Sequence, residues 1–173
     1  MKTMTMMTTS STTMTNKRTF LEWIGYALMI FCIVGLDQFT KYLSLTDLRP
    51  IDVFDLWPGV FRLNYEENTG AAFSMLSGHT WIFIVLTVLL CSFLVYLLSK
   101  GSVHSAIGRI ALVFVLAGGI GNLIDRIFRG FVVDMFDFYL IDFAVFNVAD
   151  VFVCCGCGLF ILAFIVSKGE ILD

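Results

Sequence analysis

The sequence is poor in charge and in histidine, and it has no long run of basic residues. Asp, Glu, Lys and Arg make up 14% of its 173 residues, whereas soluble domains carry about a quarter. A formal net charge of −3 without a basic run excludes a nucleic-acid-binding role. The two histidines, His79 and His104, lie far along the chain from the Cys-Cys-x-Cys run at 154–157, so the usual zinc ligands do not occur together.

Apolar residues are abundant instead, at 58% of the chain. This composition predicts a polytopic membrane protein. All five cysteines lie inside apolar segments, which argues against a secreted disulfide framework, and free cysteine packs as a small hydrophobe. We therefore expect no metal and no cofactor. The cysteines are Cys32, Cys91, Cys154, Cys155 and Cys157.

Four apolar runs, each long enough to cross a bilayer as a helix, follow a polar tail. Residues 1–19 begin with a Met-, Thr- and Ser-rich stretch and are predicted to be a disordered tail. Residues 20–173 are predicted to form a single membrane domain. The first run is too long for a signal peptide and shows no A-x-A cleavage site. The expected spans are about residues 20–43, 80–99, 105–124 and 147–167.

Between the first two spans, residues 44–79 form the only sizeable polar segment. Phe61, Leu63 and Tyr65 alternate with polar residues, which predicts a half-buried strand in a small sheet on the membrane surface. Asn68-Thr69-Gly70 is typical of a turn. It fits an ordinary loop, or a place where Gly70 lets another chain approach the backbone closely.

Carboxylates at the ends of membrane segments indicate either function or ion pairing, because a charge inside the bilayer costs roughly 3 kcal/mol on insertion scales. Asp37 and Lys41 stand at i and i+4, so they form either a simple salt bridge or part of a functional site. Four spans place Asp37, Asp125, Asp134 and Asp150 on one side of the membrane. The small residues at 118, 119 and 121 predict close helix packing nearby.

Asp134 and Asp150 are the candidate pair for hydrolysis. Two carboxyl groups held close together share one proton, so that one activates water while the other protonates the carbonyl oxygen. Spacing alone leaves Asp137 and Asp142 open as members of the pair. The run FNVAD also predicts a helix start in which Asn147 is the N-cap and Asp150 the third helical residue.

A similar polar helix end is expected where Asn122 and Asp125 stand at i and i+3, followed by Arg126. Such a helix end would position its neighbours, and we expect Arg126 to orient the site or to bind substrate carbonyls.

Five motifs in order carry a resemblance to the lipoprotein signal peptidases, the type II signal peptidases of bacterial inner membranes. The resemblance covers nearly everything after residue 20. The motifs are DQFTK at 37–41, NTGAAFS at 68–74, GGIGNLIDR at 118–126, GFVVD at 130–134 and FNVAD at 146–150.

The resemblance implies an all-α membrane protein with four transmembrane helices, a small periplasmic β-sheet cradle and a loop that carries one catalytic Asp. It implies an aspartic endopeptidase that cuts prolipoproteins before their diacylglyceryl-modified cysteine, with Asp134 and Asp150 as the catalytic pair. Membrane lipids and globomycin-type inhibitors are further implied partners. The implied supporting or substrate-binding residues are Asp37, Lys41, Asn68, Gly70, Asn122, Asp125, Arg126 and Asn147.

We further expect a monomer with cytoplasmic termini, so that the tail is cytoplasmic and the 44–79 segment and the active site are periplasmic. Of the eleven Lys and Arg residues, the terminal side carries slightly more than the other side, in the direction of the positive-inside rule. Two other classes remain open: a transporter or channel subunit with a proton relay, and a structural membrane subunit. Presenilin-type proteases are disfavoured because the chain has no G-x-G-D.

Overall fold

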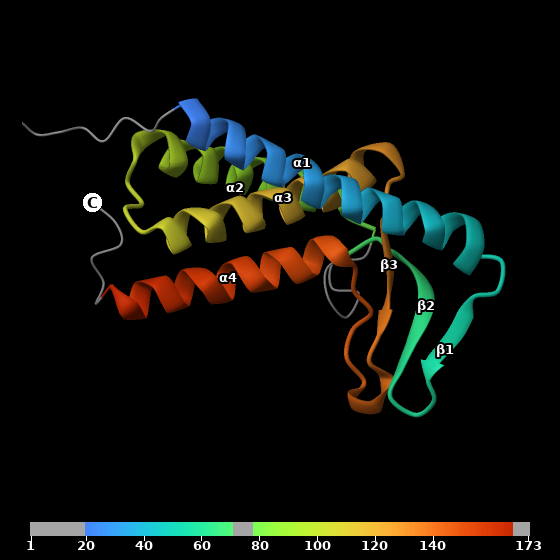
Figure 1. Ribbon diagram of the computed structural model, residues 1–173. Helices are drawn as coiled ribbons and strands as arrows, with labels where there is room; N and C mark the ends of the chain where they lie inside the picture. The colour runs from blue at the N-terminus through green and yellow to red at the C-terminus, as the bar shows by residue number, and fades with distance from the viewer. Residues whose placement is uncertain (1–19, 71–77, 168–173) are drawn as a thin grey trace, which may run out of the picture.

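The protein is a bundle of four long helices with a small sheet at one end (Figure 1). The structure, a computed structural model, describes residues 20–70 and 78–167. Each helix is long and apolar enough to cross a bilayer. The predicted fold of four membrane helices and a small sheet is confirmed. The helices are α1 (Phe20–Leu43), α2 (Thr80–Lys100), α3 (Ala106–Phe128) and α4 (Val148–Val166).

Helix α3 is the centre of the bundle, and α1, α2 and α4 each pack against it. The core of the bundle consists of apolar side chains from α2, α3 and α4, such as Leu98, Val113 and Ala163. Apolar residues elsewhere on α1, α2 and α4 are exposed, among them Phe31, Leu89 and Ile165. Helices that expose apolar side chains in this way are typical of proteins surrounded by a lipid bilayer and not by water.

Close packing of α3 depends on two of its glycines, as predicted. A Cβ added at Gly118 would overlap the carbonyl of Ala149 in α4. A Cβ added at Gly121 would lie 2.6 Å from Asp37 Oδ2. Both glycines therefore let α1, α3 and α4 approach at the same end of the bundle.

The sheet is antiparallel with strand order β1-β2-β3 and lies at the end of the bundle where α4 begins (Figure 1). Its strands are β1 (Val53–Trp57), β2 (Phe61–Asn68) and β3 (Val132–Asp137). A one-turn π-helix, η1 (Ser44–Leu48), joins α1 to the sheet and places Leu48 on Val133 and Met135 of β3. The strand predicted from Phe61, Leu63 and Tyr65 is β2.

Two segments differ from their expected form. Asp134, expected on a loop, lies in β3, a strand that the sequence does not reveal because Val132, Val133, Asp134 and Met135 are all buried and no alternation results. Helix α3 runs to Phe128, beyond the expected end at 124, so Asp125 and Arg126 are helical. The tail at 1–19, the end of the NTGAAFS motif at 71–74 and residues 168–173 lie outside the described residues.

Candidate active site

Four acidic side chains gather where the helices meet the sheet. Asp37 comes from α1, Asp125 from α3, Asp134 from β3 and Asp150 from the first turn of α4. Asp37 and Asp125 are 0% exposed and Asp134 is 1% exposed. Because a buried carboxylate is costly unless it is paired and hydrogen-bonded, each of these groups needs partners within the protein.

Lys41 is the cationic partner of two of these carboxylates, Asp37 and Asp125. Its Nζ lies 3.0 Å from Asp37 Oδ2 and 3.0 Å from Asp125 Oδ2, and it donates to Asn122 Oδ1 at 2.9 Å. The three N–H groups of the ammonium are thereby satisfied. The predicted Asp37–Lys41 ion pair is confirmed, and both of its side chains are buried in the interior of the protein. Asp37 Oδ1 also accepts from Ala149 N at 2.9 Å, so it caps α4 from outside that helix.

Gln38 and Arg129 complete this ion cluster, and sequence reasoning missed both. Gln38 Nε2 donates to Asp37 Oδ2 and to Asp125 Oδ1, each at 3.1 Å. Arg129 forms an ion pair with Asp125 and donates to Gln38 Oε1 at 3.3 Å. The signal for Arg129 was its i+4 spacing from Asp125. Two carboxylates and two cations leave the cluster without net charge.

Asn147 lies between the candidate pair. Its Nδ2 donates to Asp134 Oδ1 at 2.6 Å. Its backbone N–H donates to Asp150 Oδ2 at 3.2 Å, and its Oδ1 accepts from Asp150 N at 3.0 Å. The predicted helix start at Asn147 is therefore confirmed as a capping box. The same residue that begins α4 also joins the two carboxyl groups.

Asn122 and Asn68 hold the outer oxygens of the pair. Asn122 Nδ2 donates to Asp150 Oδ1 at 2.7 Å, and Asn68 Nδ2 donates to Asp134 Oδ2 at 2.9 Å. Asn122 Oδ1 is itself fixed by Lys41 and by Asn147 Nδ2 at 3.1 Å. The ion cluster thus orients Asn122, and Asn122 orients Asp150.

A cavity of about 570 Å³ opens beside the pair. Its polar end is lined by Asn68, Asn122, Arg126 and Asp150. The remaining wall comes from the segment at 143–146, from Val132 and from α4. Asp134 does not line the cavity, but its Oδ2 accepts a hydrogen bond from Asn68, which does. A ligand in the cavity would therefore meet Asp150 first and reach Asp134 past the Asn68 amide.

Arg126 joins the turn after β2 to this cavity. Its Nη2 donates to Gly70 O at 3.1 Å, and its guanidinium carbon Cζ lies 5.1 Å from the centroid of the Phe83 ring. Gly70 N in turn donates to Asn68 Oδ1 at 2.9 Å, which fixes the amide that holds Asp134. Arg126 Nε is buried and has no hydrogen-bond partner among the described residues. A donor of this kind beside a cavity can bind an acceptor of a ligand.

Asp137 and Asp142, left open by the sequence, do not join the pair. Asp137 Oδ2 accepts from Arg62 Nε at 2.7 Å on the sheet. Asp142 is exposed at the end of a short 3₁₀ turn, η3 (Tyr139–Ile141), with φ of 48°. The side chains of Asp137 and Asp142 therefore have different environments from that of Asp150.

The environment of Asp134 raises the pKa of its carboxyl group toward neutral pH. Burial, followed by the neighbouring charge of Asp150, raises the pKa of Asp134 from 3.8 to about 7. Hydrogen bonds from Asn68 and Asn147 and the charge of Lys41 act in the opposite direction. A carboxyl group with such a pKa can give up or take a proton at physiological pH.

Four helices long enough to cross a membrane, with a buried, amide-bridged carboxylate pair at one end of the bundle, have the arrangement expected of a membrane protease of the aspartic class. The comparisons with known proteins agree. Residues 29–166 match the family model for signal peptidase (SPase) II, and the chain belongs to the signal peptidase II family of aspartic endopeptidases.

Curated relatives are lipoprotein signal peptidases, and a solved structure that it resembles is a bacterial membrane enzyme. It is 44% identical over 131 residues to the lipoprotein signal peptidase of Clostridioides difficile (strain 630), covering 76% of this chain and 88% of the relative. It is 40% identical over 139 residues to the lipoprotein signal peptidase of Streptococcus thermophilus (strain CNRZ 1066), covering 80% of this chain and 91% of the relative. A bacterial membrane enzyme determined at 2.3 Å by the in meso method superposes with a TM-score of 0.79 at 31% identity, covering 89% of this chain and 94% of that one.

Proposed function

We propose that Asp134 and Asp150 are the carboxylates with which this protein removes signal peptides from prolipoproteins, the activity of its family. The observation that carries the assignment is the position of Asn147 between the two carboxyl groups. Its side-chain Nδ2 donates to Asp134 Oδ1, while its side-chain Oδ1 accepts from Asp150 N and its backbone N–H donates to Asp150 Oδ2. A cavity adjoins Asp150, and the pKa of Asp134 is raised to about 7. The bond cut is the peptide bond before the diacylglyceryl-modified cysteine.

In this mechanism Asp150 is the general base and Asp134 the general acid. Water bound in the cavity gives a proton to Asp150 and attacks the carbonyl carbon, while Asp134 protonates the carbonyl oxygen. The resulting gem-diol collapses as its hydroxyl proton returns to Asp134 and Asp150 protonates the leaving nitrogen. The C–N bond then breaks. The initial protonation state of the pair is restored, and one water is consumed.

The other site residues position these groups or hold the substrate. Asp37, Lys41 and Asp125 are positioning residues, because they act through Asn122 and through the start of α4. Asn122 and Asn147 orient the pair itself. Asn68 and Gly70 hold the substrate backbone at the edge of the cavity. Arg126 Nε, which has no partner among residues 20–70 and 78–167, donates to a substrate carbonyl.

A proton relay would need acidic groups spread along the membrane helices. The described carboxylates of the ion cluster and the pair lie instead at one end of the bundle. A structural subunit would need neither the pair nor the cavity. The family assignment and the geometry thus favour the endopeptidase over both rival classes.

The same proposal places the protein in the bacterial inner membrane. Four spans put the termini on one side of the membrane and the sheet with the carboxylate pair on the other. If the termini are cytoplasmic, the site is periplasmic. A substrate that stays in the bilayer would then reach it from the outer leaflet. Residues 1–19 would be a cytoplasmic tail on a single domain. The protein would act as a monomer in contact with membrane lipids and would bind globomycin-type inhibitors.

The lipid of the substrate is expected to decide turnover. Burial of acyl chains contributes about 0.8 kcal/mol per CH₂, so a precursor without the lipid should be cut at least about 10-fold more slowly at subsaturating concentration. Mass spectrometry of both precursors after incubation with the purified protein measures this. Equal cleavage of both would identify a general membrane protease instead.

The rate of cleavage is expected to fall above neutral pH. The pKa of Asp134 is raised to about 7, so the group holds its proton below that pH and loses it above. With both carboxylates ionised, no acid remains for the carbonyl oxygen. We expect kcat/KM to decline with an apparent pKa near 7 that belongs to the pair. A profile that stays flat from about pH 6 to about pH 9 would rule out this assignment of the acid.

A further inference from the structure

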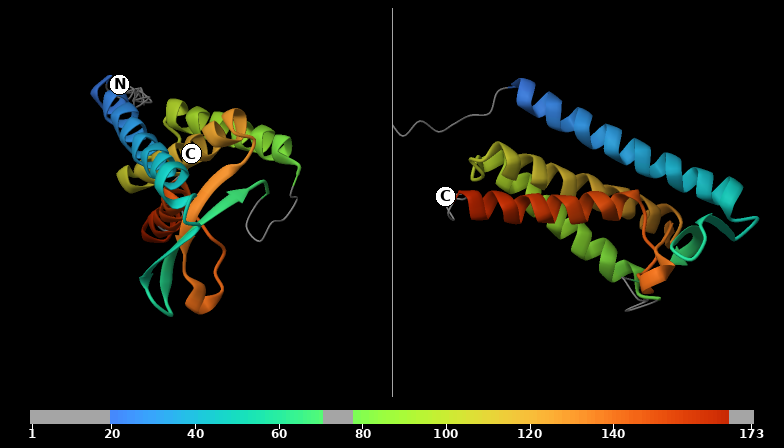
Figure 2. Two further views of the ribbon diagram at one scale, coloured as in Figure 1. Left: turned by 90° about the vertical axis from the view of Figure 1, so that its right-hand side faces the viewer. Right: turned by 60° about the horizontal axis from the view of Figure 1, so that its bottom comes forward.

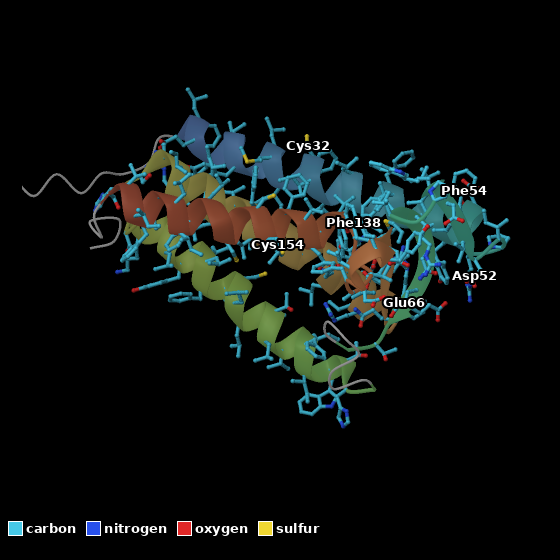
Figure 3. The ribbon with its side chains drawn as sticks, turned by 90° about the horizontal axis from the view of Figure 1, so that it is seen from below. Cys32, Asp52, Phe54, Glu66, Phe138 and Cys154 are labelled. Carbon is cyan, nitrogen blue, oxygen red and sulfur yellow. The ribbon has the colours of Figure 1, made fainter. Side chains whose placement is uncertain are left out.

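The cavity beside Asp150 continues along the first two turns of α4, a helix long and apolar enough to cross a membrane. Val151, Cys154 and Cys155 line it. Cys154 stands four residues after Asp150, so it lies on the same face of α4 and about 6 Å deeper in the bilayer. Figure 3 shows Cys154 on α4, between the sheet end and the middle of the bundle. The wall changes within one helical turn from carboxylate and amide groups to small apolar side chains.

This part of α4 is open at its side. Val151, Cys154 and Cys155 are exposed as well as lining the cavity. Helix α2 diverges from α4 toward the sheet end (Figure 2, right; Figure 3). Gly158, a further turn along the same face, has no heavy atom within 4 Å of the place where a Cβ would stand. The cavity is therefore flanked by an exposed face of a helix that is apolar enough to lie among acyl chains.

We propose that the Val151–Gly158 face of α4 is the subsite for one acyl chain of the substrate's diacylglyceryl group, with Cys154 and Gly158 limiting its width. The proposal rests on the proposed function, because the chemistry of that substrate fixes the position of its lipid. The glycerol is bonded to Sγ of the residue whose nitrogen leaves, only a few covalent bonds from the peptide bond that is cut. With the scissile bond at Asp150, the chains must begin beside the cavity wall.

Two alternative positions for the chains fit less well. At its polar end the cavity is bounded by Asn68, Asn122 and Arg126, which would leave a CH₂ chain against polar groups; the wall formed by Val132 and residues 143–146 is apolar but belongs to the sheet end and not to a membrane-spanning helix. A second cavity, of about 270 Å³, lies between α1, η1 and the sheet and is lined by Leu48, Phe54 and Met135. None of the four site carboxylates lines it. Among the described walls of these two cavities, the α4 face combines apolar lining and exposed side chains with a position on the same helix as Asp150.

Substitutions that place larger side chains on the α4 face test whether it binds an acyl chain. Gly158→Leu adds a side chain where the described structure has room, so folding should be retained, and Cys154→Phe narrows the wall one turn nearer the pair. Gly25→Leu is the matched control, since Gly25 is also an exposed helical glycine with nothing within 4 Å of an added Cβ, at the far end of α1. The substrates are one precursor peptide carrying a dipalmitoyl or a dibutyryl glyceryl group.

We expect Gly158→Leu and Cys154→Phe to lower kcat/KM for the dipalmitoyl substrate by at least about 10-fold, mostly through KM, and to change the dibutyryl substrate by less than about 2-fold. Gly25→Leu should behave as the wild type. Equal losses on both substrates, or no loss on either, would overturn the subsite; the second result would mean that a membrane phospholipid or nothing occupies this face. Failure of the proposed function would look different, because the wild type would then cut neither substrate.

Discussion

Asp134→Asn and Asp150→Asn are each expected to abolish cleavage while the protein remains folded. An amide keeps the shape of the carboxyl group but cannot exchange its proton, and general acid and base catalysis each contribute about 10²- to 10⁴-fold in rate. Because the two groups act on one substrate as a unit, the double variant should be no slower than the slower single variant. Single-turnover rates with a lipidated precursor measure all three variants.

Two neighbouring aspartates provide controls. Asp142→Asn changes an exposed residue at φ of 48°, a backbone conformation that Asn tolerates well, and should leave the rate unchanged. Asp137→Asn weakens the bond to Arg62 on the sheet and should affect stability more than chemistry. Near-normal turnover by either Asp134→Asn or Asp150→Asn would show that the assigned pair is wrong.

Lys41→Met is expected to have the largest effect on stability. Lys41 is 0% exposed and lies 3.0 Å from both Asp37 and Asp125, so the substitution leaves two carboxylates buried without their shared cation. Breaking a buried ion pair in this way costs about 3–5 kcal/mol. The unfolding temperature in detergent should fall by many degrees. Activity should fall with it, since Asn122 loses the ammonium that orients it toward Asp150.

A second substitution separates charge from packing. Lys41→Met combined with Asp37→Asn removes one charge of each sign and should recover part of the lost stability. Lys100→Met, at the end of α2, removes a lysine outside the cluster and should leave the unfolding temperature nearly unchanged. An unfolding temperature of Lys41→Met within about one degree of wild type would contradict the importance of the cluster.

The helices could be predicted from the sequence because each is a long apolar run bounded by polar residues. Helix α3 is longer than expected, since Asp125 and Arg126 look like the polar end of a span but remain helical through contacts with other elements. Asp125 pairs with Lys41 of α1, and Arg126 donates to Gly70. Strand β3 could not be predicted, because burial on both faces removes the alternation by which strands are found.

The members of the site could be predicted from motifs, but their connections could not. FNVAD predicts the Asn147 cap, whereas the donation of the same side chain to Asp134 depends on where β3 lies. Gln38 joins Asp37 to Asp125 across α1 and α3, a contact between residues 87 positions apart. The cavity and the open face of α4 arise from how α4 packs on α3, which no local pattern specifies.

The most direct test is the mass of the products formed by the purified protein in lipid from a precursor with a diacylglyceryl-modified cysteine. The account predicts one new N-terminus, at the modified cysteine, produced by the wild type and by Asp142→Asn and absent with Asp134→Asn and with Asp150→Asn. A cut at another bond, or the same product from either variant of the pair, would contradict it.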